Sequence, residues 1–397
     1  MTSEQAYFIQ LLRDFVHQSP SLEPPDSLNW DLITQYAADQ DLNGIVYFQC
    51  RDRKSIDAKV REKLHRGFLS DAYRAVNGEA AMAELTSRFD ETGIDYLPFK
   101  GEVLRQYYLV PELRTMGDRD ILIHPEDRKA SDRIMTELGY SKFVDNHAVW
   151  TYQRPALMFE IHDVMFYEHL ANSVDYRSYF NRVWDSALPS DGHRFLPEPE
   201  LHFLYLMTHT AKHVINHGMG FRAFLDMVFF CRGENALDWT SLREKLEELS
   251  LYDFTLRCFS LCEAWFNVKM PLSGEAPSAE FLSEATEKIF HDGIFGLENE
   301  DNAAAHSAKE IARDDMPYGL AAIRLIFRSL FPSYEDMQLI PWYAWVDGKP
   351  WLLPAAWIYR WFYVLCKKRD VGKTKLREPF ERQHIEKRQF MLKRWGL

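Results

Sequence analysis

The stretch from residue 94 to residue 123 constrains the fold most, because an apolar run, a Lys-Gly step, a helical segment and two aspartates follow one another within it. Ile94 to Phe99 is apolar, so we expect a buried strand that stops at Lys100 and Gly101. Residues 102–108 are then predicted to form a helix. A strand that passes through glycine into a helix directs free backbone N–H groups and the positive helix end at one spot, where Lys100 adds a full charge. Such a spot suits a phosphate group.

Two aspartates begin the next predicted strand. Asp118 and Asp120 flank one residue at the start of an alternating apolar segment that runs to Ile123. Side chains two residues apart on a strand share a face, so these two positions should lie about 6–7 Å apart along the backbone. Hard oxygen ligands at this spacing suit Mg²⁺ or Mn²⁺ bound to a nucleoside triphosphate. We therefore expect a divalent-metal site here.

A third carboxylate comes from residues 157–162, where Glu160 and His162 alternate with apolar residues and so share one face. If this strand pairs with residues 119–123, Glu160 joins the two aspartates. Three acids on neighbouring strands repel one another unless cations lie between them, which argues for a metal site. Asp163 is the alternative third acid, on the opposite face. His162 could orient an acceptor or a phosphate, or be a histidine satisfied inside the sheet.

These motifs resemble those of a known family. The residues that carry the resemblance are Lys100, Gly101, Leu104, Tyr107 or Tyr108, Arg114, the Asp-x-Asp-x-Leu motif at Asp118, and the Glu-x-His motif at Glu160. They are similar to those of the bacterial uncharacterised nucleotidyltransferase-like family of the DNA polymerase β superfamily, most strongly over residues 80–165. One departure is that the usual Gly-Ser or Gly-Gly after the first strand is replaced by Lys100-Gly101-Glu102, so a phosphate-contacting hydroxyl is missing.

The resemblance implies metal-dependent transfer of a nucleoside monophosphate from a nucleoside triphosphate to an acceptor hydroxyl or phosphate, with release of pyrophosphate. Asp118 and Asp120 would hold Mg²⁺ on the β- and γ-phosphates and a second ion at the α-phosphate. Glu160 would bind the second ion and help to deprotonate the acceptor, while Lys100 would neutralise the triphosphate. The acceptor could be a small molecule, a saccharide or a peptide.

A stripe of histidines marks one helix of the second half of the chain. Its members are His202, His209, His213 and His217. We expect this face either to line the cleft, with His209 or His213 near substrate phosphates, or to pack in the interior. Zinc binding is the third alternative, although Thr210 stands where a zinc protease would have glutamate.

Two arginines could bind substrate or pair within the protein. Arg114 follows the predicted phosphate spot, and its partner is either a phosphate or Glu112. Arg222 and Asp226 are spaced i,i+4 on a predicted helix and would form an ion pair at the same wall.

The periodicity predicts an α+β fold, with a small mixed β-sheet flanked by an N-terminal helical segment and a large all-helical C-terminal domain, and the resemblance implies that the sheet is a nucleotidyltransferase core. The predicted divisions are residues 1–75, 76–190 with its catalytic sheet, and 191–397 with a basic tail. Further strands are expected over residues 142–144 and 149–153. C-terminal helices are predicted over residues 201–216, 221–231, 239–248, 252–266, 279–290, 303–314, 318–327 and 351–367.

The charge distribution bears on partners and location. The net charge of −12 disfavours nucleic acid as a partner, yet residues 367–397 carry eleven basic and four acidic side chains. This tail could contact phosphates or a membrane, or dock on the acidic body. Residues 351–366 are too short to span a bilayer and include Pro354 and Arg360, so they form a packed helix or lie in the membrane interface. No signal peptide is recognisable, and we expect a cytoplasmic protein.

Two other functions stay open on this evidence. The chain could bind nucleotides without turnover, as a scaffold whose helical half and tail contact a partner. It could also be a nucleotidyltransferase that acts on tRNA, which the acidic body disfavours and the basic tail permits.

Overall fold

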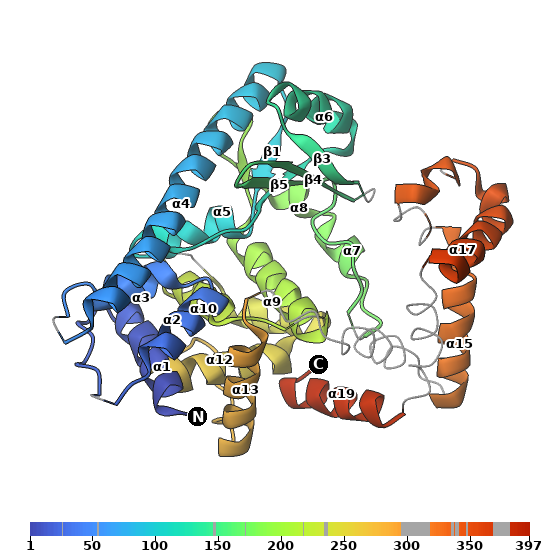
Figure 1. Cartoon of the computed structure of the whole chain (residues 1–397). Coiled ribbons are helices and arrows are strands. Elements are labelled where there is room, and N and C mark those ends of the chain that lie inside the picture. The colour runs from blue at the N-terminus through green and yellow to red at the C-terminus, as the bar shows by residue number, and fades with distance from the viewer. Residues whose placement is uncertain are drawn as a thin grey trace.

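The computed structural model is built on a five-stranded mixed β-sheet with helices on both faces (Figure 1). It describes the whole chain apart from residues 26, 54, 146–147, 171, 217, 234–236, 295–317, 335–336, 338–340, 347 and 368–381. The mixed sheet and the helical C-terminal half confirm the predicted α+β class.

The sheet places the two predicted acidic strands side by side. The strands are β1 (Tyr96–Pro98), β2 (Arg119–Ile123), β3 (Ser141–Asp145), β4 (Val149–Arg154) and β5 (Leu157–His162), in the spatial order β1-β2-β5-β4-β3. The central pair of β2 and β5 is parallel, and its register sets Asp120 opposite Glu160. The other neighbours pair antiparallel. The pairing on which the third carboxylate depended is therefore confirmed.

Helices α4 (Ala58–Thr92) and α6 (Arg128–Glu137) cover one face of the sheet (Figure 1). Apolar strand residues such as Ile121 and Ile161 are buried against them. Helix α4 ends at Gly93, whose φ of 73° is the left-handed conformation that suits glycine. Because strand side chains alternate, the acids of β2 and β5 face the opposite side.

That opposite face looks toward α9 (Pro199–Asn216). The ring of Phe99, just after β1, lies 5.3 Å from the Tyr205 ring of α9 and 5.0 Å from the His162 ring of β5. These edge-to-face contacts fix the distance between the helix and the acidic face.

The connections around the sheet are built from short elements. They are α5 (Gly101–Leu104), η1 (Arg105–Tyr107), η2 (Pro111–Leu113), η3 (Pro125–Asp127), α7 (Tyr176–Phe180), α8 (Val183–Ser186), β6 (Leu188–Pro189) and β7 (Phe195–Leu196). The prediction of one helix over residues 102–108 is wrong in its type and length, since the segment forms a single α-helical turn, α5, followed by the 3₁₀ turn η1. The elements between β5 and α9 were not predicted, because runs of two to five residues are too short to show a period.

The N-terminal helices pack together with the helices that follow the sheet. Helices α1 (Ser3–Val16), α2 (Trp30–Asp39), α3 (Asn43–Cys50), α9, α10 (Phe221–Arg232), α11 (Trp239–Glu248), α12 (Tyr252–Phe266) and α13 (Ala279–Asp292) share one hydrophobic core. The Phe8 ring of α1 lies 6.0 Å from that of Phe221 and 5.6 Å from that of Phe290. The three-part division of the chain stays a prediction.

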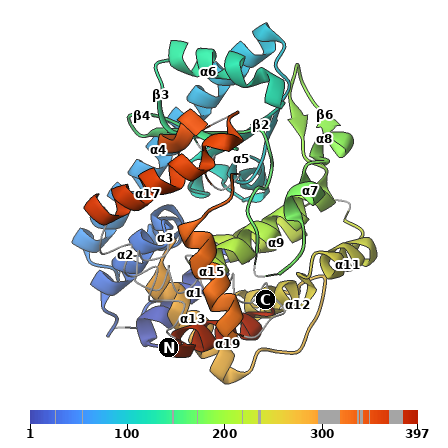
Figure 2. The ribbon, with the colours of Figure 1, turned by 90° about the vertical axis from the view of Figure 1, so that its right-hand side faces the viewer.

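The last described helices are α15 (Tyr318–Leu330), α17 (Leu353–Lys367) and α19 (Arg382–Trp395), with the 3₁₀ turns η4 (Pro341–Val346) and η5 (Pro350–Leu352) between α15 and α17 (Figure 2). Helix α19 docks on the body, since Arg388 donates to the carbonyl oxygens of Val214 and Ile215 at 3.0 and 2.8 Å. The predicted helix over residues 303–314, His217 and tail residues 368–381 lie outside the described residues. Among the helices described, none is long and apolar enough to cross a membrane.

Candidate active site

Lys100 lies at the junction of β1 and α5, directly beside the acidic face of the sheet. Its φ of 51° and ψ of −125° favour glycine, so lysine is held in this conformation at a cost of roughly 1–3 kcal/mol. Its Nζ donates to Oδ1 of Asp120 at 2.5 Å and lies 3.9 Å from Oε2 of Glu160. Burial opposes its charge, but Asp120 outweighs burial and raises the pKa of Lys100 well above its ordinary value. Lys100 is therefore not a surface lysine, since its ammonium is held by the acids of the sheet.

An imidazole completes a cluster of three possible metal ligands. Nε2 of His162 lies 2.9 Å from Oδ1 of Asp120 and 3.6 Å from Oε2 of Glu160. One ligand atom from each of these three residues lies within 4.8 Å of the other two. Burial would raise the pKa of Glu160, but the hydrogen bond with His162 and the charge on Lys100 lower it, so Glu160 is ionised.

This donor set fits a divalent cation. Two carboxylates offer the oxygen ligands that Mg²⁺ and Mn²⁺ take, and an imidazole nitrogen suits a first-row transition ion better than Mg²⁺. Nδ1 of His162 makes no hydrogen bond within the described chain, so Nε2 alone links this ring to the acids.

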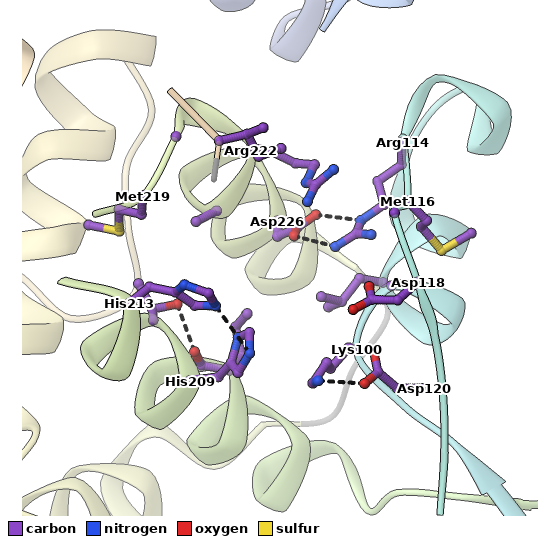
Figure 3. A pocket seen from close by; sticks show the side chains of 18 of the residues that line it. Lys100, Arg114, Met116, Asp118, Asp120, His209, His213, Met219, Arg222 and Asp226 are labelled. Carbon is purple, nitrogen blue, oxygen red and sulfur yellow. Dashed lines mark hydrogen bonds and ion pairs between the residues drawn. The ribbon is translucent and has the colours of Figure 1, made fainter. Parts of the chain in front are cut away.

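Asp118 lies one residue before β2 and faces the same cavity as Asp120 and Glu160 (Figure 3). Burial and the neighbouring charge of Asp120 raise the pKa of Asp118, while Lys100 opposes this rise. All three predicted acids thus lie in one cavity. Asp163, the alternative third acid, has its Oδ2 4.0 Å from Nη1 of Arg128 on α6, which covers the other face.

A cavity of about 340 Å³ separates the acids from α9 and α10. His209 and His213 line its far wall and face Asp118 and Lys100 across it (Figure 3). Their Nε2 atoms lie 3.3 Å apart. Burial, and after it the charge of Lys212, lowers the pKa of His209 well below its ordinary value, so this imidazole is neutral near pH 7. The alternative that the face lines the cleft is correct for these two histidines.

Arg114 pairs with a residue that lies far away in the chain. Its Nε and Nη2 donate to the two carboxylate oxygens of Asp226 at 3.1 and 2.8 Å, and the hydroxyl of Tyr108 donates to the same carboxylate at 2.8 Å. Both members of the ion pair are buried. The predicted partner Glu112 is therefore wrong, because a buried two-point ion pair with α10 satisfies the guanidinium instead.

The predicted ion pair between Arg222 and Asp226 is also wrong. Nη1 of Arg222 lies 3.4 Å from Oδ2 of Asp41 and donates to the backbone oxygen of Thr115 at 3.0 Å. Asp226 is already engaged by Arg114. The i,i+4 spacing was correct, but tertiary partners compete for both side chains.

Gly101 allows this packing. A Cβ at this position would lie 2.4 Å from Nη1 of Arg114 and 2.7 Å from Sδ of Met116. Because Asp226 holds Arg114 in place, only glycine at this position lets the Arg114 side chain approach the backbone so closely.

Three further residues line the cavity: His202 belonged to the predicted stripe and Asp226 to a predicted ion pair at the same wall, whereas Tyr205 was missed. Tyr205 and His202 lie on α9, and Asp226 lies on α10. The spacing of three to four residues between positions 202, 205, 209 and 213 was a helical signal that would have included Tyr205. No local pattern could have linked Asp226 to Arg114, which lies 112 residues earlier.

Comparison with known proteins adds one finding. The model of a family described as "Uncharacterised nucleotidyltransferase" matches residues 26–267, more than half of the chain. The match includes the whole sheet, the acidic cluster and both helices of the opposite wall. No curated protein and no solved structure matches the chain.

Proposed function

The chain belongs to the uncharacterised nucleotidyltransferase family, and we propose that it transfers a nucleoside monophosphate from a nucleoside triphosphate to an acceptor, releasing pyrophosphate. The parallel register of β2 and β5 carries the proposal. It sets Asp120 opposite Glu160, in a cavity that Asp118 and Lys100 also line. Phosphoryl transfer requires that the reacting groups be positioned and that developing charge be stabilised. Three carboxylates and one ammonium on a single concave surface can do both.

Asp118, Asp120, Glu160 and His162 would hold the divalent ion, Mg²⁺ or Mn²⁺. When bound, the ion would supply Lewis-acid stabilisation of the charge that develops on the phosphates. Two observations support this assignment: Glu160 is ionised, and Asp120 already holds the ammonium of Lys100 at short distance. Both carboxylates therefore carry the negative charge that attracts a cation. The imidazole of His162 favours Mn²⁺ over Mg²⁺.

Lys100 is the group best placed to neutralise the triphosphate. It is cationic at every working pH, and its ammonium can exchange Asp120 for a phosphate oxygen within the same cavity. The helix start after it adds less than the sequence indicated, because α5 is a single turn and its dipole is correspondingly small.

Two groups can take the proton of an attacking hydroxyl. Glu160 is ionised but weakly basic, since its pKa is lowered. His209 is neutral near pH 7 but also weakly basic, since its pKa is lowered too, and it lies on the wall that an acceptor would occupy, opposite the acids. We assign the acceptor to the α9 side of the cavity, where a small molecule, a saccharide or a peptide side chain would enter.

A second candidate function is nucleotide binding without turnover. The observation that favours it is the ion pair of Lys100 and Asp120 at 2.5 Å, which already neutralises the central carboxylate. In that case Lys100 would stay on Asp120 when nucleotide binds.

One assay separates the two candidates. The protein is incubated with each α-labelled nucleoside triphosphate, Mg²⁺ or Mn²⁺ and a cell extract as the acceptor source, and pyrophosphate and labelled products are measured. We expect transfer that falls by at least ~10²-fold in Asp118→Asn, Asp120→Asn and Glu160→Gln, since each loses a charge that the transition state needs. Asp163→Asn is the matched control, an acid beside β5 that contacts Arg128 instead. Nucleotide binding with no product from any extract would favour the non-catalytic function.

A further inference from the structure

The segment from α15 to α17 exposes large apolar side chains at a higher density than the rest of the described chain. Eight of the eighteen large apolar side chains that are exposed in the described residues fall between residues 320 and 362, and each is between 41 and 71% exposed. They are Leu320, Ile323, Phe327, Trp345, Trp351, Ile358, Tyr359 and Phe362. Exposed apolar side chains are ordinary when scattered, but a cluster of this density marks a binding surface.

The exposed residues of each helix form one face. On α15, Leu320, Ile323 and Phe327 are spaced i, i+3 and i+7, so they line one stripe. On α17, Ile358 and Phe362 are spaced i,i+4. These two stripes define the surface that we call the apolar face.

A neighbouring side of α17 carries the contacts that join this helix to the end of α15. Trp357 and Trp361 precede the exposed pair by one position, about 100° around the helix. Their indole N–H groups donate to the carbonyl oxygens of Pro332 and Leu330 at 2.9 and 2.8 Å, and both rings contact Phe331. Helices α15 and α17 are thus joined through their inner sides. This packing leaves most of the apolar face uncovered, although the Phe327 ring also lies 4.8 Å from that of Phe331.

Helix α17 and the segment that joins it to α15 form a small core of their own. Met337, Tyr343, Val346 and Ala356 are buried together in a cluster separate from the two larger cores. In Figure 1 α15 and α17 stand at the edge of the molecule, away from the sheet. The side chains of the apolar face are between 57 and 70% exposed, so they are open to solvent.

Charge points to the nature of that partner. Arg324 and Arg328, both exposed, each follow a residue of the α15 stripe by one position. Over residues 318–367 the sequence has five basic and three acidic side chains, a net charge of +2, while residues 1–317 carry −20. A positive apolar segment on an acidic body is drawn to, and oriented by, a negatively charged surface.

We propose that the apolar face of α15 and α17 docks on the surface of an anionic lipid bilayer. Trp, Tyr and Phe with flanking arginines are the side chains that suit the headgroup region, since their rings enter the acyl boundary while the guanidinium groups stay with the phosphates. The acidic body, which holds the candidate active site, then faces the solution. The inference is independent of the proposed transfer reaction.

The test is co-sedimentation of the full-length protein with vesicles. Vesicles of phosphatidylcholine mixed with phosphatidylglycerol are compared with vesicles of phosphatidylcholine alone. We expect binding to the anionic vesicles only, with at least a tenfold loss in the variant Phe327→Asp with Phe362→Asp. Leu69→Asp with Tyr73→Asp is the matched control, because these two exposed apolar residues lie on α4 and should not contribute. A blue shift of tryptophan fluorescence on vesicle addition gives a second measurement that needs no variant.

Three outcomes would overturn the proposal. The wild type could stay in the supernatant with anionic vesicles and show no fluorescence shift. The α15–α17 variant could bind as tightly as the α4 control. Light scattering could also show a dimer that the α15–α17 variant abolishes while no vesicles bind, which would assign the apolar face to a second copy of the chain.

Discussion

At the scale of single residues, Lys100 decides how the acidic cluster behaves. Its strained backbone holds the ammonium 2.5 Å from Asp120, where a divalent ion would also be drawn. Lys100→Met keeps most of the apolar stem and removes the charge. We expect Mn²⁺ to bind more tightly, since the ammonium no longer competes, and the metal-free protein to lose on the order of 3 kcal/mol of stability. Mn²⁺ titration and urea unfolding measure the two effects. An unchanged Mn²⁺ affinity would show that Lys100 does not share the site with the metal.

His202 gives a prediction for the pH dependence of stability. Burial and the nearby charge of Arg114 lower its pKa from 6.5 to about 4, although Asp226 opposes this. The unfolded chain therefore takes up a proton at a higher pH than the folded chain, so stability is present above about pH 6.5 and is lost as the pH falls toward 4. Between about pH 7.5 and about pH 5, the wild type should lose about 2 kcal/mol more than His202→Leu.

Urea unfolding of both proteins at the two pH values checks this prediction. No further control is needed, because the carboxylates that titrate in the same range are present in both proteins and cancel in the difference between them. Equal losses in the two proteins would mean that His202 is protonated in the folded state.

At the scale of elements, the ion pair of Arg114 and Asp226 ties α10 to the segment before β2. Asp226→Asn leaves a buried guanidinium without its counter-charge and should cost about 3 kcal/mol or more. Arg114→Met combined with Asp226→Asn should cost less than the sum of Arg114→Met and Asp226→Asn measured alone, because no buried charge is then left alone. A double-mutant cycle in urea provides the measurement. Strict additivity would contradict the pairing.

The elements also show what local sequence pattern can and cannot predict. The alternation around Asp120 and Glu160 was sufficient to predict two strands with their acids on a common face, because side-chain direction in a strand depends only on a two-residue period. The pattern alone did not predict that the two strands are neighbours; that step needed the family resemblance. The choice of Asp226 over Glu112 could not be predicted, since it depends on how α10 packs.

At the scale of the whole molecule, two large hydrophobic cores contain most of the buried apolar side chains of the described chain. One lies between the sheet and α4 with α6, and the other joins the N-terminal helices to α9–α13. The candidate active site lies where these two parts face each other, so Asp118, Asp120, Glu160 and His162 come from the sheet side, and His209 and His213 from the helical side. Sequence periodicity located the elements of both parts. Their mutual placement depends on contacts such as Phe99 with Tyr205, which no local pattern contains.

The central claim is that Asp118, Asp120 and Glu160 converge to bind a divalent cation. Electron paramagnetic resonance of Mn²⁺, titrated with wild type, Asp120→Asn and Asp163→Asn, tests this claim most directly. We expect the wild type and Asp163→Asn to bind Mn²⁺ alike, with tighter binding when a nucleoside triphosphate is added, and Asp120→Asn to bind at least ~10-fold more weakly. Equal Mn²⁺ binding by wild type and Asp120→Asn, with and without nucleotide, would contradict the account.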